Sequence, residues 1–101
     1  MIKINKDVIE QAIKHYGVEE EQFICMEEMA ELQQAISKCL RNKKNEENLI
    51  EEIADVLICI ENLKMIHCIK EEEIQNIIDY KQNRVFCSIV EELSGKEKED
   101  E

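Results

Sequence analysis

The sequence predicts an all-α protein. Its 101 residues include no Pro and two Gly, and Glu, Lys, Leu, Ile and Gln dominate the composition, which favours helices. Apolar residues also recur at helical spacing along most of the chain. We therefore expect one domain over residues 1–93, a four-helix-bundle-like protomer that assembles through its helices into a dimer or tetramer. A disordered, charged tail is expected over residues 94–101.

The expected helices are separated by short breaks. Asn5 is a plausible N-cap for the first helix and Gly17 a plausible C-terminal stop. The polar stretch 41–45 interrupts the apolar pattern after the second helix, and Gly95 is expected to end the fourth. We expect helices over residues 6–16, 19–40, 46–65 and 71–93.

Charge and hydropathy narrow the functional classes. The formal net charge of -11 argues against a general nucleic-acid or anionic-membrane surface. No apolar run is long enough to span a bilayer, and the first residues do not have the pattern of a signal peptide, so we expect a cytoplasmic protein with no membrane partner. The five cysteines form no Cys-x-x-Cys pair and are interpreted as reduced thiols that pack as small apolar side chains.

Two pairs of carboxylates interrupt the apolar faces of the second and third expected helices. Each pair has i, i+3 spacing, so both side chains leave the same side of the helix. At about 100° per residue, Glu28 and Glu52 fall inside the apolar arcs, and their partners fall at the edges. Since the two helices are joined by a short loop, they should pack antiparallel and bring the four acids together. These acids are Glu28, Glu31, Glu52 and Asp55.

Four inward carboxylates would repel one another unless a cation neutralised them. Oxygen ligands without His or Cys suit Mg²⁺, Mn²⁺ or Ca²⁺ rather than zinc. The sequence therefore predicts a divalent metal site. Two alternatives stay open at this point: buried Lys or Arg neutralises Glu28 and Glu52, or the helices are rotated so that the acids face water.

The fourth expected helix has cations on its apolar arc. Lys81 lies inside the arc and Arg84 at its edge. A buried lysine needs an anion, which is either one of the four acids or a phosphate. Arg84 would offer phosphate a planar fork. Acids that bind metal, facing cations that bind phosphate, would suit a metal-bound polyphosphate.

At these residues the chain resembles the MazG-like family of all-α nucleoside triphosphate pyrophosphohydrolases. Glu28-x-x-Glu31 and Glu52-x-x-Asp55 match the family pattern of E-x-x-E, a spacer and E-x-x-D. The adjacent acid pairs Glu27-Glu28 and Glu51-Glu52 also resemble this family, and so does the segment from Tyr80 to Arg84. The resemblance covers residues 13–89.

The resemblance implies a helical bundle that forms a dimer or a dimer of dimers. It also implies Mg²⁺-dependent hydrolysis of a nucleoside triphosphate to the monophosphate and pyrophosphate. Mn²⁺ is a plausible substitute. The four acids would hold the metal, Lys81 and Arg84 would contact the phosphates, and Glu27 or Glu51 could act behind the metal ligands. A second apolar strip on the third helix, which contains Ala54, Ile58 and Met65, independently indicates a partner helix.

Water would attack the α-phosphorus, and one of the acids would accept its proton. Two rival functions remain. One is a non-enzymatic helical adaptor whose acids face a protein partner, and the other is a relative restricted to one substrate, such as dUTP or dCTP. No readable spacing assigns the base or the sugar.

Overall fold

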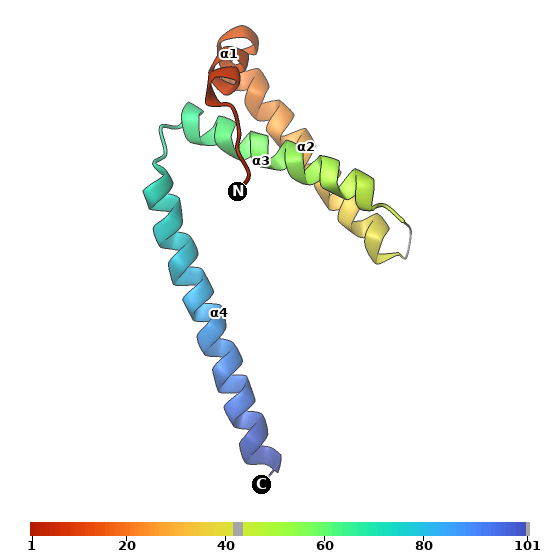
Figure 1. Ribbon diagram of the computed structural model, residues 1–101, viewed down its shortest axis with the longest axis vertical. Helices are drawn as coiled ribbons and strands as arrows, with labels where there is room; N and C mark the ends of the chain where they lie inside the picture. The colour runs from red at the N-terminus through yellow and green to blue at the C-terminus, as the bar shows by residue number, and fades with distance from the viewer. Residues whose placement is uncertain (42–43, 101) are drawn as a thin grey trace. The chain divides into compact units, whose positions relative to one another are not determined.

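The structure is a computed structural model that describes residues 1–41 and 44–100, with side chains as far as Gly95. It is all-α and bundle-like, as the composition and periodicity predict (Figure 1). The helices are α1 (Lys6–Tyr16), α2 (Val18–Leu40), α3 (Glu46–Ile66) and α4 (Glu71–Asp100). The chain divides into two units, Met1–Ile69 and Lys70–Glu101, and each is described here by itself.

Helix α1 begins and ends where the sequence predicts. The Oδ1 atom of Asn5 accepts hydrogen bonds from the backbone N–H groups of Asp7, at 3.0 Å, and Val8, at 3.4 Å. Gly17 has a φ of 96°, which suits a residue without Cβ, and its N–H donates to the carbonyl of Ile13. Gly17 is also the residue from which α2 starts, so one glycine ends α1 and begins α2.

Helices α2 and α3 form an antiparallel hairpin whose facing sides contain small buried residues (Figure 1). Cys25 and Ala35 of α2 are buried, as is Cys59 of α3. The Cys25 thiol donates to the carbonyl oxygen of Cys59 at 3.6 Å, and the Asn45 side-chain amide donates to the carbonyl of Ala35 at 3.2 Å. These contacts set the register of the hairpin, and α1 packs against both helices at the end where α2 begins. Residues 42–43 of the predicted loop lie outside the described part.

Helix α4 is longer than predicted. Its backbone remains helical to Asp100, so the expectation that Gly95 ends it is wrong. A glycine inside a helix costs about 1 kcal/mol relative to alanine, which weakens a helix without terminating it. The predicted disorder of residues 94–101 stays a prediction, because the side chains after Gly95 lie outside the described part.

The apolar side chains of α4 are exposed, including those of Ile77, Val85 and Leu93. Lys81 lies on the same helix and its side chain is exposed. Because α4 is described as a separate unit, the expectation that Lys81 faces an anion stays a prediction. Among the described residues, no helix has the length and apolar character needed to cross a membrane.

Candidate metal centre

The four predicted acids come together where α2 crosses α3. One carboxylate oxygen from each of Glu28, Glu31 and Glu52 lies within 4.8 Å of the other two. Asp55 of α3 lies near Glu28 of α2, and its charge and hydrogen-bonding contact with Glu28 raise the pKa of that carboxyl. Glu31 affects the pKa of Glu52 in the same way. The i, i+3 spacing on each helix and the antiparallel register therefore give two carboxylate pairs, each bridging the hairpin.

Burial falls across the cluster from the interface to the surface. Glu52 retains only 8% of its accessible surface. Glu28 and Asp55 are half-buried, and Glu31 is exposed. The sequence placed Glu28 and Glu52 inward and Glu31 and Asp55 at the rim. Glu52 is buried and Glu31 exposed, whereas Glu28 and Asp55 are equally half-buried between them. Glu31 makes the cluster accessible from solvent.

The environment favours protonation of the two inward carboxyls. Burial is the largest cause that raises the pKa of Glu28 to about 7, followed by the negative charge of Asp55 and the hydrogen bond to it. Burial also raises the pKa of Glu52, and the charges of Glu31 and Asp55 raise it further. Without a cation, the site therefore lowers its negative charge by binding protons.

Two oxygens of the cluster have no hydrogen-bond donor among the described residues. Oε2 of Glu28 and Oε2 of Glu52 are both fully buried and unpartnered. Ion pairs seen within residues 1–41 and 44–95 join Lys14 to Glu10 and Lys64 to Glu61, away from the four acids. Orphaned acceptors of this kind are costly unless a donor or cation reaches them. An all-oxygen donor set drawn from carboxylates fits Mg²⁺, Mn²⁺ or Ca²⁺.

A layer of two thiols separates the cluster from the next polar contact along the hairpin. Cys25 and Cys59 are almost completely buried, at 2% and 3% exposure. Burial and then the hydrogen bond with Cys25 raise the pKa of the Cys59 thiol to about 12. The raised pKa keeps the Cys59 thiol neutral, and both buried cysteines pack as small side chains, which agrees with the interpretation of the sequence for these two residues.

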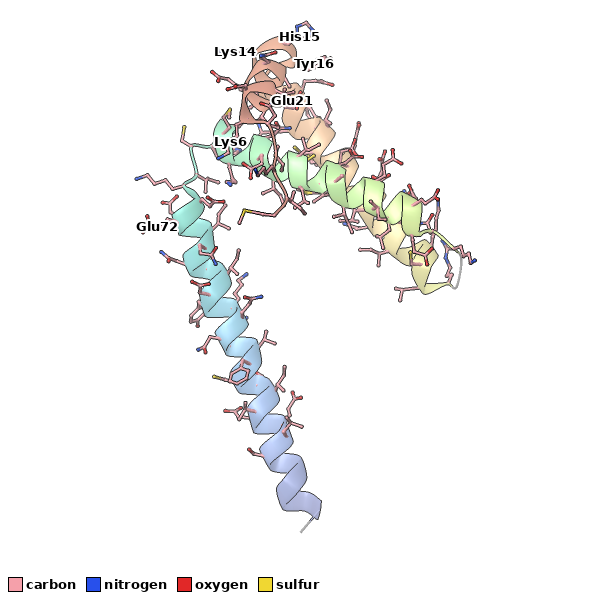
Figure 2. The ribbon with its side chains drawn as sticks, in the orientation of Figure 1. Lys6, Lys14, His15, Tyr16, Glu21 and Glu72 are labelled. Carbon is pink, nitrogen blue, oxygen red and sulfur yellow. The ribbon has the colours of Figure 1, made fainter. Side chains whose placement is uncertain are left out.

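A second polar contact crosses the interface beyond the thiols, and the sequence analysis missed it. The side-chain amide of Asn62 donates to Oε2 of Glu21 at 3.1 Å, and both residues are 5% exposed. Glu21 is labelled in Figure 2, where it lies on α2 beside α1. Glu21 precedes Glu28 by seven residues and Asn62 follows Asp55 by seven, so the phase that singled out the acids also identifies this pair.

The predicted phosphate ligands Lys81 and Arg84 lie on α4, in the other unit, and both side chains are exposed. The Arg84 guanidinium lies 6.0 Å from the centre of the Tyr80 ring. Their role toward phosphate therefore stays a prediction. Glu27 and Glu51 are exposed on α2 and α3, next to Glu28 and Glu52 in the sequence.

Comparisons with known protein families, curated proteins and solved structures gave no match to this chain. The geometry and chemistry of the carboxylate cluster therefore provide the structural basis for assigning a function. The cluster offers carboxylate oxygens, some of them buried and one at an exposed edge, and carboxylate oxygen is the ligand type that hard divalent cations prefer.

Proposed function

We propose that this chain is a metal-dependent hydrolase that converts a nucleoside triphosphate to the nucleoside monophosphate and pyrophosphate. The observation that carries the metal-binding part is the pair of buried, unpartnered oxygens on Glu28 and Glu52. Among the described residues no ion pair joins a lysine or arginine to the four acids, so their mutual repulsion destabilises the helix interface unless a cation binds. The resemblance to MazG-like enzymes supports the substrate class.

The residues that would hold Mg²⁺ are Glu28, Glu31, Glu52 and Asp55, with Mn²⁺ as a substitute. A bound divalent ion would supply charge neutralisation for the phosphates and acidify a coordinated water. The buried Glu52 fixes the inner edge of the site, and the exposed Glu31 borders solvent, where a triphosphate arrives. The thiol layer of Cys25 and Cys59 closes the inner side against water.

In the proposed reaction, the oxygen of water bonds to the α-phosphorus and the bond from that phosphorus to the bridging oxygen of the β-phosphate breaks. Pyrophosphate leaves with the bonding electron pair. A carboxylate of the cluster, or the adjacent Glu27 or Glu51, accepts the proton of the attacking water. Lys81 and Arg84 stabilise negative charge on the phosphates. Base and sugar preference are left to experiment, including restriction to dUTP or dCTP.

The test is pyrophosphate release from a panel of individual NTPs and dNTPs with Mg²⁺, using the full chain and Glu52→Gln. Glu46→Gln is the matched control, because Glu46 is an exposed acid on the same helix outside the cluster. We expect Glu52→Gln to lower kcat/KM by about 10²–10³-fold and Glu46→Gln to leave it unchanged. Absence of pyrophosphate with every nucleotide would overturn the proposal.

A second candidate function is a helical adaptor that binds a protein partner. The exposed apolar residues of α4, among them Ile77, Phe86 and Leu93, favour it. Mg²⁺ distinguishes the candidates: a metal enzyme gains thermal stability from Mg²⁺ through Glu52, whereas an adaptor without a metal site does not. We also propose that the chain forms a homo-oligomer.

A further inference from the structure

The two buried thiols of the α2–α3 hairpin lie together at the helix interface. The Cys25 thiol donates to the carbonyl oxygen of Cys59 at 3.6 Å, and the two residues are 2% and 3% exposed. Burial is the largest cause that raises the pKa of the Cys59 thiol, and contact with the Cys25 thiol is the next. Two sulfur donors, one from each helix, are therefore held in one place.

This thiol pair lies one helical turn from two carboxylates of the cluster. Glu28 follows Cys25 by three residues on α2, and Asp55 precedes Cys59 by four residues on α3, so each thiol shares a helix face with a carboxylate. After burial and the contact with Cys25, the negative charges of Glu28 and Asp55 raise the pKa of the Cys59 thiol further. Oε2 of Glu28 is buried and has no partner among the described residues. It is an oxygen donor available to an ion at the thiols.

The charge of the thiol pair favours a divalent ion. When such an ion replaces two thiol protons, the total charge of the layer does not change, so the complex avoids the cost of a buried net charge. Thiolate sulfur is a preferred ligand of Zn²⁺, whereas Mg²⁺ takes oxygen ligands. The oxygens that lie within 4.8 Å of one another belong to Glu28, Glu31 and Glu52 and include neither sulfur. An ion held by sulfur therefore lies inward of an ion held by these oxygens.

We propose that Cys25, Cys59 and Glu28 form a site for one thiophilic divalent ion of the Zn²⁺ type, on the inner side of the carboxylate cluster. Glu28 is the shared ligand, because a carboxylate turned toward the thiols is withdrawn from the oxygens that would hold Mg²⁺. The soft ion and the hard ion therefore exclude each other. Binding through sulfur does not rest on the proposed hydrolysis, and it is tested without nucleotide.

The test is titration of the full chain with Cd²⁺, which takes the ligands of Zn²⁺ and gives an ultraviolet charge-transfer band when thiolate binds it. Two variants divide the five cysteines. Cys39→Ser/Cys68→Ser/Cys87→Ser keeps only the facing pair and should retain the band and the Kd of the unmodified chain. Cys25→Ser/Cys59→Ser keeps the other three thiols, and we expect its Kd for Cd²⁺ to rise by about tenfold or more.

A second pair of variants tests the oxygen ligand. Glu28→Gln should weaken Cd²⁺ binding by about tenfold, whereas Glu20→Gln, at an exposed acid of α2 outside the cluster, should leave it unchanged. Saturating Mg²⁺ should raise the Kd for Cd²⁺ of the unmodified chain, and an unchanged Kd would overturn the shared role of Glu28.

The fold of each variant is checked by urea unfolding without metal, and Cys25→Ala/Cys59→Ala repeats the thiol test with a side chain that makes no hydrogen bond. The proposal is overturned if the unmodified chain gives no charge-transfer band, or if both variants of the facing pair bind Cd²⁺ as tightly as the unmodified chain. It is also overturned if Glu28→Gln binds Cd²⁺ as tightly as Glu20→Gln.

Discussion

The hairpin of α2 and α3 contains two buried polar layers of opposite character. In one layer the amide of Asn62 donates to the carboxylate of Glu21, although Oδ1 of Asn62 itself has no partner among the described residues. In the other layer four acids meet one another, and oxygens of Glu28 and Glu52 have no donor. The same helices, in the same register, thus bury one carboxylate that the protein satisfies itself and a group of carboxylates that it leaves unsatisfied. The second arrangement needs protons or a cation from outside.

The largest expected effect separates the layers by their response to metal. Mg²⁺ or Mn²⁺ at about 100 times its Kd should stabilise the unmodified chain by about 2.7 kcal/mol, because the ion binds only the folded state. Glu52→Gln should remove this stabilisation and Asn62→Leu should retain it. Thermal unfolding with and without metal measures both. Equal metal stabilisation in Glu52→Gln would show that the ion binds elsewhere.

The next effect concerns the layer of Glu21 and Asn62. Asn62→Leu removes the donor of Glu21 and leaves a buried carboxylate unpaired, which should lower the free energy of unfolding by about 1–3 kcal/mol. Urea unfolding measures the loss, and it should be the same in the presence and absence of Mg²⁺. A loss that disappears with Mg²⁺ would mean that the two layers are coupled across the thiols.

The sequence alone allowed part of this comparison to be predicted. The limits of α1 follow from local chemistry, since Asn5 and Gly17 act on their own neighbours. The gathering of the acids follows from helix phase and a short loop, which leave one antiparallel packing. Asn62 has the same helix phase as Asp55, but its amide is uncharged, so its inward position is not unusual enough to indicate a site. Helix phase places Lys81 among the apolar residues of α4 but does not show what packs against that face, so its role stays a prediction.

The pH dependence of stability should distinguish the layers as well. Burial raises the pKa of Glu28 from 4.5 to about 7, so the folded chain binds more protons than the unfolded chain between these values. Stability of the metal-free chain therefore falls as pH rises from about 4.5 to 7. We expect Tm to fall by on the order of 5 °C. Glu28→Gln should flatten this dependence of Tm on pH. Saturating Mg²⁺ should restore at pH 8 the Tm that the metal-free chain has lost.

The smallest effect is expected outside both layers. Glu27 and Glu51 are exposed, so Glu27→Gln/Glu51→Gln should change the free energy of unfolding by less than about 0.5 kcal/mol. The metal-induced rise in Tm should also stay the same. A large drop in pyrophosphate release in this variant, with stability unchanged, would identify one of the two as the proton acceptor.

The single-residue connection at Gly17 has a mechanical consequence. Helix α1 packs against α2 and α3 at the end of the hairpin where Glu21 is buried. Since α1 and α2 meet at one glycine with a φ of 96°, the orientation of α1 is governed by very few torsion angles. A rotation about the backbone of Gly17 would therefore move the whole of α1 relative to the hairpin, together with its contacts near Glu21.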